Sequence, residues 1–439
     1  MLIAFLGIFV YGLLAALPGA VLPTLERNRY LPNDNTVGTF LLINAAGAVL
    51  AYIVSGPIID RIGKKFALGS GTALVIASMT GFALAVTKVS PGSALLLIFG
   101  CSLVLGLGAN AIVAAGHALV VDVAAHWRNA ALNLLDIFFG LGLAALPLVV
   151  QRVQQYGGLA AIFWSLGGVA VVLLVLILAP RFPRPSQPES ASSGGARELF
   201  RNPSFWILAI ALFMYVGTEV AVGKWVVSYM ERDARMLSSQ GLNPAQLQQL
   251  ARTSTESLNR FFEQDPLGIG IATYALRSLA FFAFALLTGR LVSSLLLGVF
   301  RVNSFVLLTA GSVLTTLALI VAFTTSSPTA VRMGLIAAGF GMGPIFPTSV
   351  GLASVMMPHM AGTAMSLVMG VGFAGLLLIP PAVGYISTAA GGEVGDVRTG
   401  LIAVMAASVV MLLLHALLAW RERRLAHLRE DELETGAAG

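Results

Sequence analysis

The chain has 439 residues, of which 57% are hydrophobic and 10% are charged, and its formal net charge is +6. A soluble domain carries roughly 25% charged residues, so this composition excludes a water-soluble globular protein and predicts a surface that faces lipid. Lys and Arg form no basic stripe with interleaved aromatic residues, so we expect no nucleic-acid partner. The single cysteine, Cys101, excludes an internal disulfide.

Twelve apolar segments follow one another, each close to the ~20 residues that a helix needs to cross a bilayer. Lipid offers no partner to backbone polar groups, so each segment is expected to be an α-helix. The first lacks a charged leading region and a small-residue cleavage site, which favours a membrane helix over a signal peptide. The predicted spans are residues 2–22, 36–58, 66–86, 93–120, 130–152, 158–180, 205–230, 267–289, 302–323, 330–355, 361–387 and 399–420.

The hydrophobic pattern breaks once, in a stretch rich in Pro, Ser, Gly and charge, which we interpret as a linker between two six-helix halves. Lys and Arg are more numerous in the loops on the linker side, which predicts that this side and both termini are cytoplasmic. The predicted units are an N-terminal half (1–180), a cytoplasmic linker (181–204), a C-terminal half (205–420) and a cytoplasmic tail (421–439).

A long loop, residues 231–266, interrupts the C-terminal half and is predicted to lie on the extracytoplasmic side. Within it, Asn243 followed by Pro244 indicates a helix start, and the run to Phe262 is expected to form a short surface helix. A passive loop is favoured over a lid, and both interpretations stay open.

The segment between spans two and three reads GPIIDRIGKKFAL, from Gly56 to Leu68. It resembles the signature of the major facilitator superfamily in that loop. The resemblance implies twelve helices in two pseudo-symmetric halves, and a latch that acts when the halves rock. An alternative is that the basic residues only fix topology, and both roles are compatible. The latch residues are Gly56, Asp60, Arg61, Gly63, Lys64 and Lys65.

Spans four and ten share a glycine pattern, which favours two related halves. Span four reads GLGANAIVAAG over residues 106–116, and span ten reads GFGMGPIFPTSVG over residues 339–351. Matching positions in two halves are typical of a transporter built from repeats. The second-half counterpart of the signature loop is degenerate, with only Gly289, Arg290, Leu291 and Arg301 in place.

Four ionisable residues fall inside predicted spans: Asp136, Glu219, Lys224 and Arg277. Such residues are costly in a membrane and usually face a cavity or a partner. One interpretation is two buried ion pairs that hold the halves together. The favoured one is a central cavity in which Asp136 and Glu219 carry protons while Lys224 and Arg277 contact substrate. Glu219 and Lys224 are five positions apart, about 140° around a helix, so we do not expect them to pair directly.

Neutral hydrogen-bonding side chains accompany these charges and complete the predicted substrate site, although each one alone also fits interhelical hydrogen bonding. Hydroxyl-rich solutes need paired donors and acceptors and an aromatic face. The predicted substrate contacts of this kind are Asn110, His117, Asn133, Tyr215 and Trp225.

Four further segments resemble the fucose–galactose–glucose:proton symporter branch of the family: LNLLDIFFGLG, EVAVGKWVVSYM, the GRL that ends span eight, and GPIFPTSVGLAS. This resemblance implies cation-coupled uptake of a monosaccharide through a central cavity. The chain departs from the branch in two places. Span one has no acid, and Asn110 stands where the branch has an acid in span four. Coupling is therefore expected to rest on Asp136 or Glu219.

We predict a secondary active transporter, a proton-coupled symporter that takes up a sugar or sugar-like solute by alternating access. The alternative is an organic-anion or sugar-acid carrier that uses Lys224 and Arg277, and drug efflux ranks lower. We find no nucleophile–base constellation, phosphate loop or metal-ligand cluster, so no enzyme, cofactor or metal is expected. The expected partners are a small-molecule substrate, protons and lipid, with the chain acting as a monomer in the inner (plasma) membrane.

Overall fold

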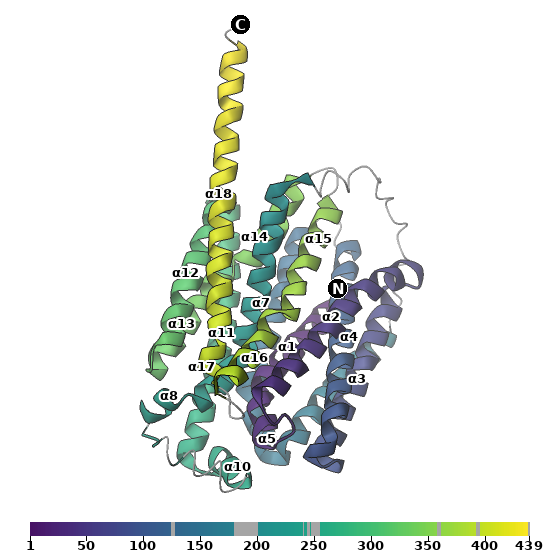
Figure 1. Ribbon diagram of the computed structural model, residues 1–439. Helices are drawn as coiled ribbons and strands as arrows, with labels where there is room; N and C mark the ends of the chain where they lie inside the picture. The colour runs from purple at the N-terminus through teal and green to yellow at the C-terminus, as the bar shows by residue number, and fades with distance from the viewer. Residues whose placement is uncertain are drawn as a thin grey trace.

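The computed structural model describes residues 1–123, 128–179, 201–239, 241–243, 246, 255–357, 361–391 and 396–437. Every regular element in these ranges is a helix (Figure 1). Eleven helices among the described residues are long and apolar enough to cross a membrane. One of them, Leu134–Leu178, has 45 residues, about twice the length of one crossing. The fold is therefore the expected all-α membrane bundle, with room for twelve crossings.

The N-terminal bundle shows how the twelfth crossing arises. Its last helix reverses at Gly157 and Gly158, where the backbone leaves helical geometry and Gly158 takes a φ of 64°. Only glycine adopts such a conformation without steric cost. The predicted spans five and six are thus two arms joined by a glycine turn. The helices are α1 (Leu2–Arg27), α2 (Asp34–Arg61), α3 (Lys64–Lys88), α4 (Pro91–Val123) and α5 (Arg128–Leu178).

The C-terminal bundle begins several of its long helices with a capping side chain followed by proline. Asn202, Asp265 and Ser327 each accept a backbone N–H of the first turn, and a proline occupies the next position. Proline there loses no hydrogen bond and presets the helical φ. The elements are α7 (Pro203–Arg232), α8 (Ala234–Ser239), α10 (Thr255–Gln264), α11 (Pro266–Gly298), α12 (Ser304–Thr324), α13 (Pro328–Met342), α14 (Ile345–Met356), α15 (Ala361–Ala374), the 3₁₀ turn η2 (Gly375–Leu377), α16 (Ile379–Gly391), α17 (Val397–Gly400) and α18 (Ile402–Ala437).

The structure bears on three predicted connections, and two of them lie partly outside the described ranges. Most of the linker predicted at 181–204, and Pro244 of the predicted helix start, lie outside them. Within loop 231–266 the structure contains two short helices, α8 and α10. The tail predicted at 421–439 continues α18, which extends beyond the rest of the bundle (Figure 1).

The glycine pairs of spans four and ten make equivalent contacts in the two bundles. A side chain at Gly106 would place its Cβ 2.0 Å from a carbonyl oxygen of α2, and one at Gly108 would place it 2.7 Å from a carbonyl oxygen of α3. In the C-terminal bundle the corresponding distances are 2.5 Å from Gly339 to a carbonyl oxygen of α11 and 2.8 Å from Gly341 to a carbonyl oxygen of α12. Each pair therefore lets one helix touch the backbones of two neighbours, as expected for related halves.

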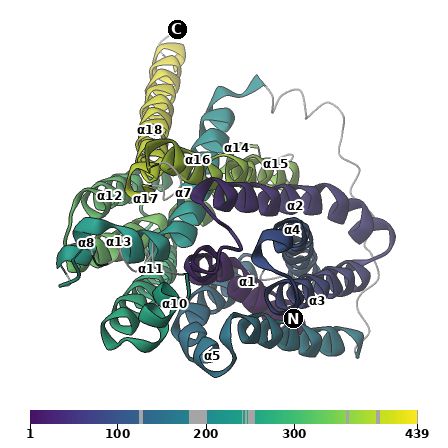
Figure 2. The ribbon, with the colours of Figure 1, turned by 60° about the horizontal axis from the view of Figure 1, so that its bottom comes forward.

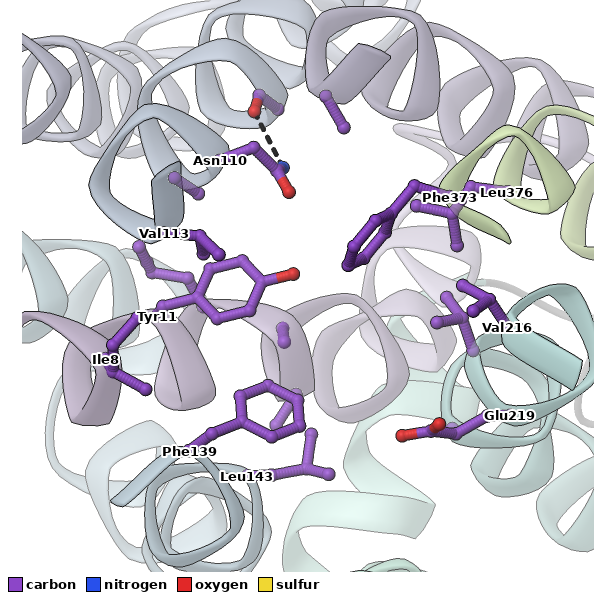
Figure 3. Close-up of a pocket in the computed structure, with 18 of the residues that line it drawn as sticks. Ile8, Tyr11, Asn110, Val113, Phe139, Leu143, Val216, Glu219, Phe373 and Leu376 are labelled. Carbon is purple, nitrogen blue, oxygen red and sulfur yellow. Dashed lines mark hydrogen bonds between the residues drawn. The ribbon is translucent and has the colours of Figure 1, made fainter. Parts of the chain in front are cut away.

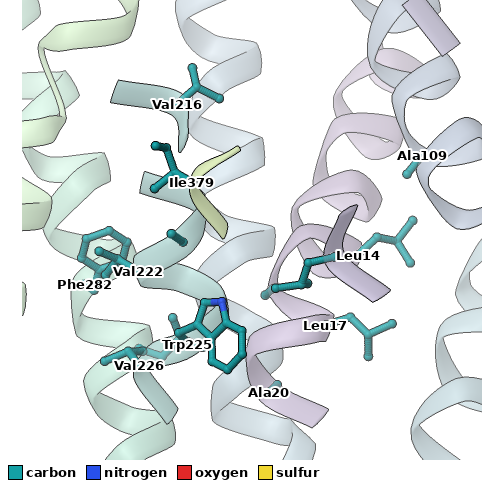
Figure 4. Close-up of a cluster of buried hydrophobic side chains, with 14 of the residues drawn as sticks. Leu14, Leu17, Ala20, Ala109, Val216, Val222, Trp225, Val226, Phe282 and Ile379 are labelled. Carbon is teal, nitrogen blue, oxygen red and sulfur yellow. The ribbon is translucent and has the colours of Figure 1, made fainter. Parts of the chain in front are cut away.

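The two bundles lie side by side, with α2 along α16 and α5 along α11 (Figure 2). They approach most closely towards the end of the molecule that carries α8 and α10, here called the α10 end. At Gly19 of α1 an added Cβ would lie 1.9 Å from the carbonyl oxygen of Gly223 in α7. Beside this contact, Trp225 lies between the ribbons of α7 and α1 among buried aliphatic side chains (Figure 4). This packing closes the interface at the α10 end.

Candidate functional site: a central cavity between the halves

A cavity of about 550 Å³ lies between the two bundles. Its wall is built from α1, α2, α4 and α5 on one side and from α7, α11, α14, α15 and η2 on the other. A volume in this range suits a small molecule, since ligand pockets commonly enclose roughly 300–1,000 Å³. Because both halves contribute, any movement of one half against the other changes the cavity.

Aromatic rings form two walls of the cavity. Tyr11 of α1 stacks on Phe139 of α5 with ring centroids 5.4 Å apart, and its hydroxyl points into the open space (Figure 3). Tyr52 of α2 stacks on Phe373 of α15 at 5.0 Å, which joins the two halves. Phe346 packs edge-on against Phe373 at 6.1 Å. Such faces accept flat or ring-shaped solutes by apolar contact.

Asp136, Glu219 and Arg290 form a charged group in the cavity, called here the Arg290 triad. Arg290 of α11 places Nη2 3.9 Å from Glu219 Oε1 of α7, and both side chains are nearly buried. Asp136 of α5 is close enough to attract Arg290 and to repel Glu219. The guanidinium also lies 5.7 Å from the Phe139 ring centroid. The triad therefore places Arg290, paired with Glu219 of its own half, in the same part of the cavity as a carboxylate of the other half.

Lys224 lies apart from this triad. It lines the cavity, is 9% exposed, and donates from Nζ to Asn44 Oδ1 at 3.4 Å. No carboxylate among the described residues lies within ion-pair distance of Lys224. The expectation that Glu219 and Lys224 do not pair directly agrees with this arrangement. A buried cation without a counter-charge is costly, so this part of the cavity attracts negative groups.

Two of the neutral residues predicted for the site line the cavity from α4. Asn110 is 6% exposed and donates from Nδ2 to the Gly106 carbonyl at 2.9 Å, whereas its Oδ1 has no partner among the described residues. His117 contacts the Val113 carbonyl oxygen through Nδ1 at 2.9 Å. Asn110 therefore keeps an acceptor for a solute donor. Asn133 lies in α5, but its side chain is outside the described part of the chain.

Three other predicted contacts lie outside the cavity. Tyr215 is fully buried in α7 behind the cavity wall. Trp225 is fully buried and donates its indole N–H to the Pro380 carbonyl at 2.8 Å, so its polar atom serves packing between α7 and α16. Arg277 is exposed on the outer face of α11. Helix rotation turns Trp225 and Arg277 away from the central opening, whereas the Tyr215 hydroxyl lies close to Glu219 and Arg290 of the cavity wall.

Several cavity residues were missed by the sequence analysis. Arg290 was interpreted as part of a loop after span eight, but α11 continues to Gly298 and keeps Arg290 inside. Tyr11, Tyr52 and Phe373 carried no charge to mark them, although a tyrosine within an apolar span is a signal that was available. The cavity still has the predicted two acids and two bases, because Arg290 occupies the place that was predicted for Arg277.

The cavity reaches from the middle of the bundle towards the end that carries the GPIIDRIGKKFAL loop, called here the signature-loop end. Its wall includes Ile59, two residues before the end of α2, and Asp136, eight residues after the start of α5. Towards the α10 end it is closed by the Gly19–Gly223 contact and the Trp225 core. Among the described residues, this packing therefore seals the α10 end.

The signature loop itself is a tight turn between α2 and α3. Gly63 caps α3 with a φ of 111°, a conformation that favours glycine. Lys64 is buried, Arg61 is exposed, and Lys65 donates from Nζ to the Leu178 carbonyl at the end of α5 at 2.8 Å. The exposure of Gly56 and the side chain of Asp60 lie outside the described set. The loop therefore joins α3 to the last arm of the same half.

The family model described as Major Facilitator Superfamily matches residues 4–251, more than half of the chain. The chain belongs to the major facilitator superfamily. Among curated major facilitator relatives, an uncharacterized MFS-type transporter of Yersinia pestis is 23% identical over 87% of each chain. Bypass of stop codon protein 6 of Saccharomyces cerevisiae is 24% identical over 50% of this chain, and the match spans 48% of that protein. Protein TsgA of Salmonella arizonae is 22% identical over 54% of this chain and 59% of its own length.

Solved structures show the same major facilitator fold. The D-xylose–proton symporter superposes with a TM-score of 0.72 at 14% identity, covering 95% of this chain and 96% of that one. The nucleoside transporter NupG gives 0.70 at 13% identity, covering 95% and 98%. An inward-facing bacterial homologue of Spinster gives 0.68 at 15% identity, covering 96% of each chain. The chain is accordingly a multi-pass membrane transporter, and its family is not one of enzymes.

Metal binding finds no support among the residues that the structure describes, where no three His, Cys, Asp or Glu side chains gather at one place. The chemistry of the cavity is instead that of hydrogen bonds, aromatic faces and four charges.

Proposed function

We propose that the chain is a secondary active transporter that couples a small polar solute, a sugar or sugar-like molecule, to protons by alternating access. The observation that carries this proposal is the Arg290 triad, in which Arg290 pairs with Glu219 at 3.9 Å and Asp136 of the other half lines the same cavity. The aromatic walls and the free Oδ1 of Asn110 suit a hydroxylated ring. With the signature-loop end in the cytoplasm, the sealed α10 end faces the opposite side of the membrane, which suits an inward-facing state of the proposed transport cycle.

Proton binding at the triad would change how the halves attract each other. Burial disfavours an ionised carboxylate, while a nearby cation favours it. With both acids ionised, Arg290 is attracted to Asp136 and Glu219 together. Once Glu219 binds a proton, Arg290 keeps a strong attraction only to Asp136 of the other half. Occupation by a proton is thereby linked to the relative position of the halves, as coupled transport requires.

A proteoliposome experiment tests this coupling. A thermal-shift screen over sugars, sugar acids and dicarboxylates first identifies a solute, because binding stabilises the folded state by mass action. An inward proton gradient should then drive uphill uptake. Asp136→Asn or Glu219→Gln should lose this drive but retain solute exchange at equilibrium. Glu263→Gln, which changes an exposed acid at the α10 end, serves as control. Uphill uptake that persists in both cavity variants would refute the coupling assignment.

A second candidate is an organic anion or sugar acid, and Lys224 favours it. This cation is buried in the cavity beside Asn44 without a carboxylate partner in the described chain. The Lys224→Gln variant separates the two candidates. It should abolish binding of an anionic solute, whereas a neutral sugar should bind with little change. Arg277, predicted as the second contact for an anion, lies outside the cavity and takes no part in this proposal.

A further inference from the structure

Arg277 occupies a position where a charge is unusual, on the outward-facing stripe of α11. The stripe is otherwise marked by exposed apolar side chains, with Phe281 41% exposed, Phe284 39% and Leu291 46%. These residues recur at the three- to four-residue spacing of one helix face. In a chain that crosses a bilayer this face contacts lipid. Arg277 therefore points towards lipid rather than towards the cavity or a neighbouring helix.

The neighbouring helix places a second arginine at the same height. Arg332 of α13 donates from Nε to Ser278 Oγ and from Nη2 to the Tyr274 carbonyl, both at 2.9 Å. Its guanidinium lies over the Tyr274 ring, 3.2 Å from the centroid. Arg277 is close enough to repel the charge of Arg332. Two cations thus meet on the outside of the α11–α13 pair.

The depth of this pair in the membrane follows from the turn between α12 and α13. Helix α12 ends at Thr324 and α13 begins at Pro328, so this turn marks the membrane surface at the α10 end. Arg332 is four residues into α13, about 6 Å along its axis. Because Arg332 touches Tyr274 and Ser278, Arg277 lies at that depth too. This is the level of lipid headgroups, where Arg and Tyr side chains gather.

Charge balance at this spot requires an anion. Arg277 has no hydrogen-bond acceptor and no carboxylate partner in the described part of the chain, and no described carboxylate pairs with Arg332. Two like charges at a low-dielectric surface repel, and an anion placed between them converts repulsion into attraction. Guanidinium groups match the oxygen geometry of a phosphate. The surrounding lipid supplies such groups at this depth.

We propose that Arg277 and Arg332 form a binding site for the phosphate of an anionic phospholipid, with the acyl chains lying against Phe281 and Phe284. Tyr274 and Ser278 hold the Arg332 guanidinium in place, while Arg277 supplies the second set of donors. The site is separate from the transport cavity, and it needs neither the proposed solute nor proton coupling.

The test uses the purified full chain in nanodiscs of phosphatidylcholine, with part of that lipid replaced by phosphatidylglycerol. We expect phosphatidylglycerol to raise the melting temperature of the wild-type chain, and native mass spectrometry to retain a bound phosphatidylglycerol. Arg277→Gln should lose most of this rise in melting temperature and should bind phosphatidylglycerol roughly five-fold more weakly. This is the change in affinity expected for the loss of one interfacial basic residue. Because Arg277 makes no hydrogen bond or ion pair within the described chain, its variant should be at least as stable as wild type in phosphatidylcholine.

Arg152→Gln is the matched control, because it removes an exposed arginine of α5 at the same end of the bundle. It should keep the full effect of phosphatidylglycerol. Inorganic phosphate added to the phosphatidylcholine discs should leave the melting temperature unchanged, which separates a lipid site from a phosphate site. Equal gains from phosphatidylglycerol in wild type, Arg277→Gln and the Arg277→Gln, Arg332→Gln double variant would overturn the proposal.

Discussion

Asp34 of α2 and Arg232 of α7 are 198 positions apart in the chain, yet Arg232 Nη1 donates to Asp34 Oδ1 at 2.5 Å. The same nitrogen donates to Glu26 Oε1 of α1 at 2.9 Å, so one cation binds two acids of the other half. Beside them, Arg27 pairs with Glu231 at 2.5 Å. These bonds cross between the halves at the α10 end and hold it closed.

The first prediction concerns this closure. Asp34→Ala leaves Arg232 with one acid fewer, and breaking a buried ion pair costs about 3–5 kcal/mol. We expect the conformational equilibrium of the chain to shift towards a state that is open at the α10 end. Ser228 of α7, fully buried beside Glu26, reports the opening when replaced by cysteine. Labelling of Ser228→Cys by an impermeant maleimide should accelerate at least tenfold, with little background from the buried Cys101.

The control for that experiment is an ion pair that lies within one half. Arg398 and Asp233, 3.6 Å apart, both belong to the C-terminal half. Asp233→Ala should therefore leave the labelling rate near that of the parent. Equal acceleration in both variants would mean that the Asp34 effect is a general loss of stability.

The second prediction concerns Gly19. An added Cβ would lie 1.9 Å from the Gly223 carbonyl oxygen, so Gly19→Ala must push α1 away from α7. Transport should fall at least tenfold, since the halves can no longer close at the α10 end. Gly100 has nothing within 4 Å of an added Cβ. Gly100→Ala should leave transport intact and raise stability by about 0.5–1 kcal/mol. Normal uptake by Gly19→Ala would contradict the role of this contact.

The third prediction tests the position of Trp225. Trp225→Phe leaves the buried Pro380 carbonyl without its donor, which costs about 1–3 kcal/mol of stability. A thermal melt should show this loss. The dissociation constant of the solute should stay within about two-fold, because the indole does not line the cavity. A large loss of affinity at unchanged stability would place Trp225 in the solute site.

The fourth prediction concerns Tyr11, whose hydroxyl points into the cavity (Figure 3). Tyr11→Phe removes one hydrogen-bonding group and should weaken solute binding about two- to ten-fold, measured by titration calorimetry. Tyr11→Ala should weaken it further, since the stack on Phe139 is lost as well. Tyr30 donates to the Val86 carbonyl at 2.9 Å outside the cavity. Tyr30→Phe should lower stability and spare affinity.

Much of the fold was predictable because lipid imposes a strong pattern on sequence. Each crossing needs a long apolar run, and each of the twelve predicted runs falls on a helical stretch. Helix ends were less accurate, since a helix continues past the lipid. Glu26 and Arg290 both lie in such extensions. The ion pair of the closed end and the cation of the triad were therefore missed.

The cavity was predictable only in part, because hydropathy identifies a membrane helix but does not show which of its faces points towards the cavity. Asp136, Glu219 and Lys224 line the opening, whereas Arg277 of equal polarity faces outward. In an aqueous protein the polar face of a helix points to solvent. In a membrane protein the polar face of a helix usually points inward, towards a cavity or a neighbouring helix. Near the lipid headgroups it can also point outward. We propose that Arg277 lies at headgroup depth, near the turn between α12 and α13, although it is eleven residues from the start of α11.

The reversal of α5 at Gly157–Gly158 also bears on biogenesis. The two arms leave the ribosome with only the short polar run QRVQQY (residues 151–156) and the glycine pair between them, and neither apolar arm can stay in water while the other partitions into lipid. The pair must therefore be integrated together, as a hairpin. Lengthening this connection with a polar insert would uncouple the two insertion steps and favour chains with inverted later helices.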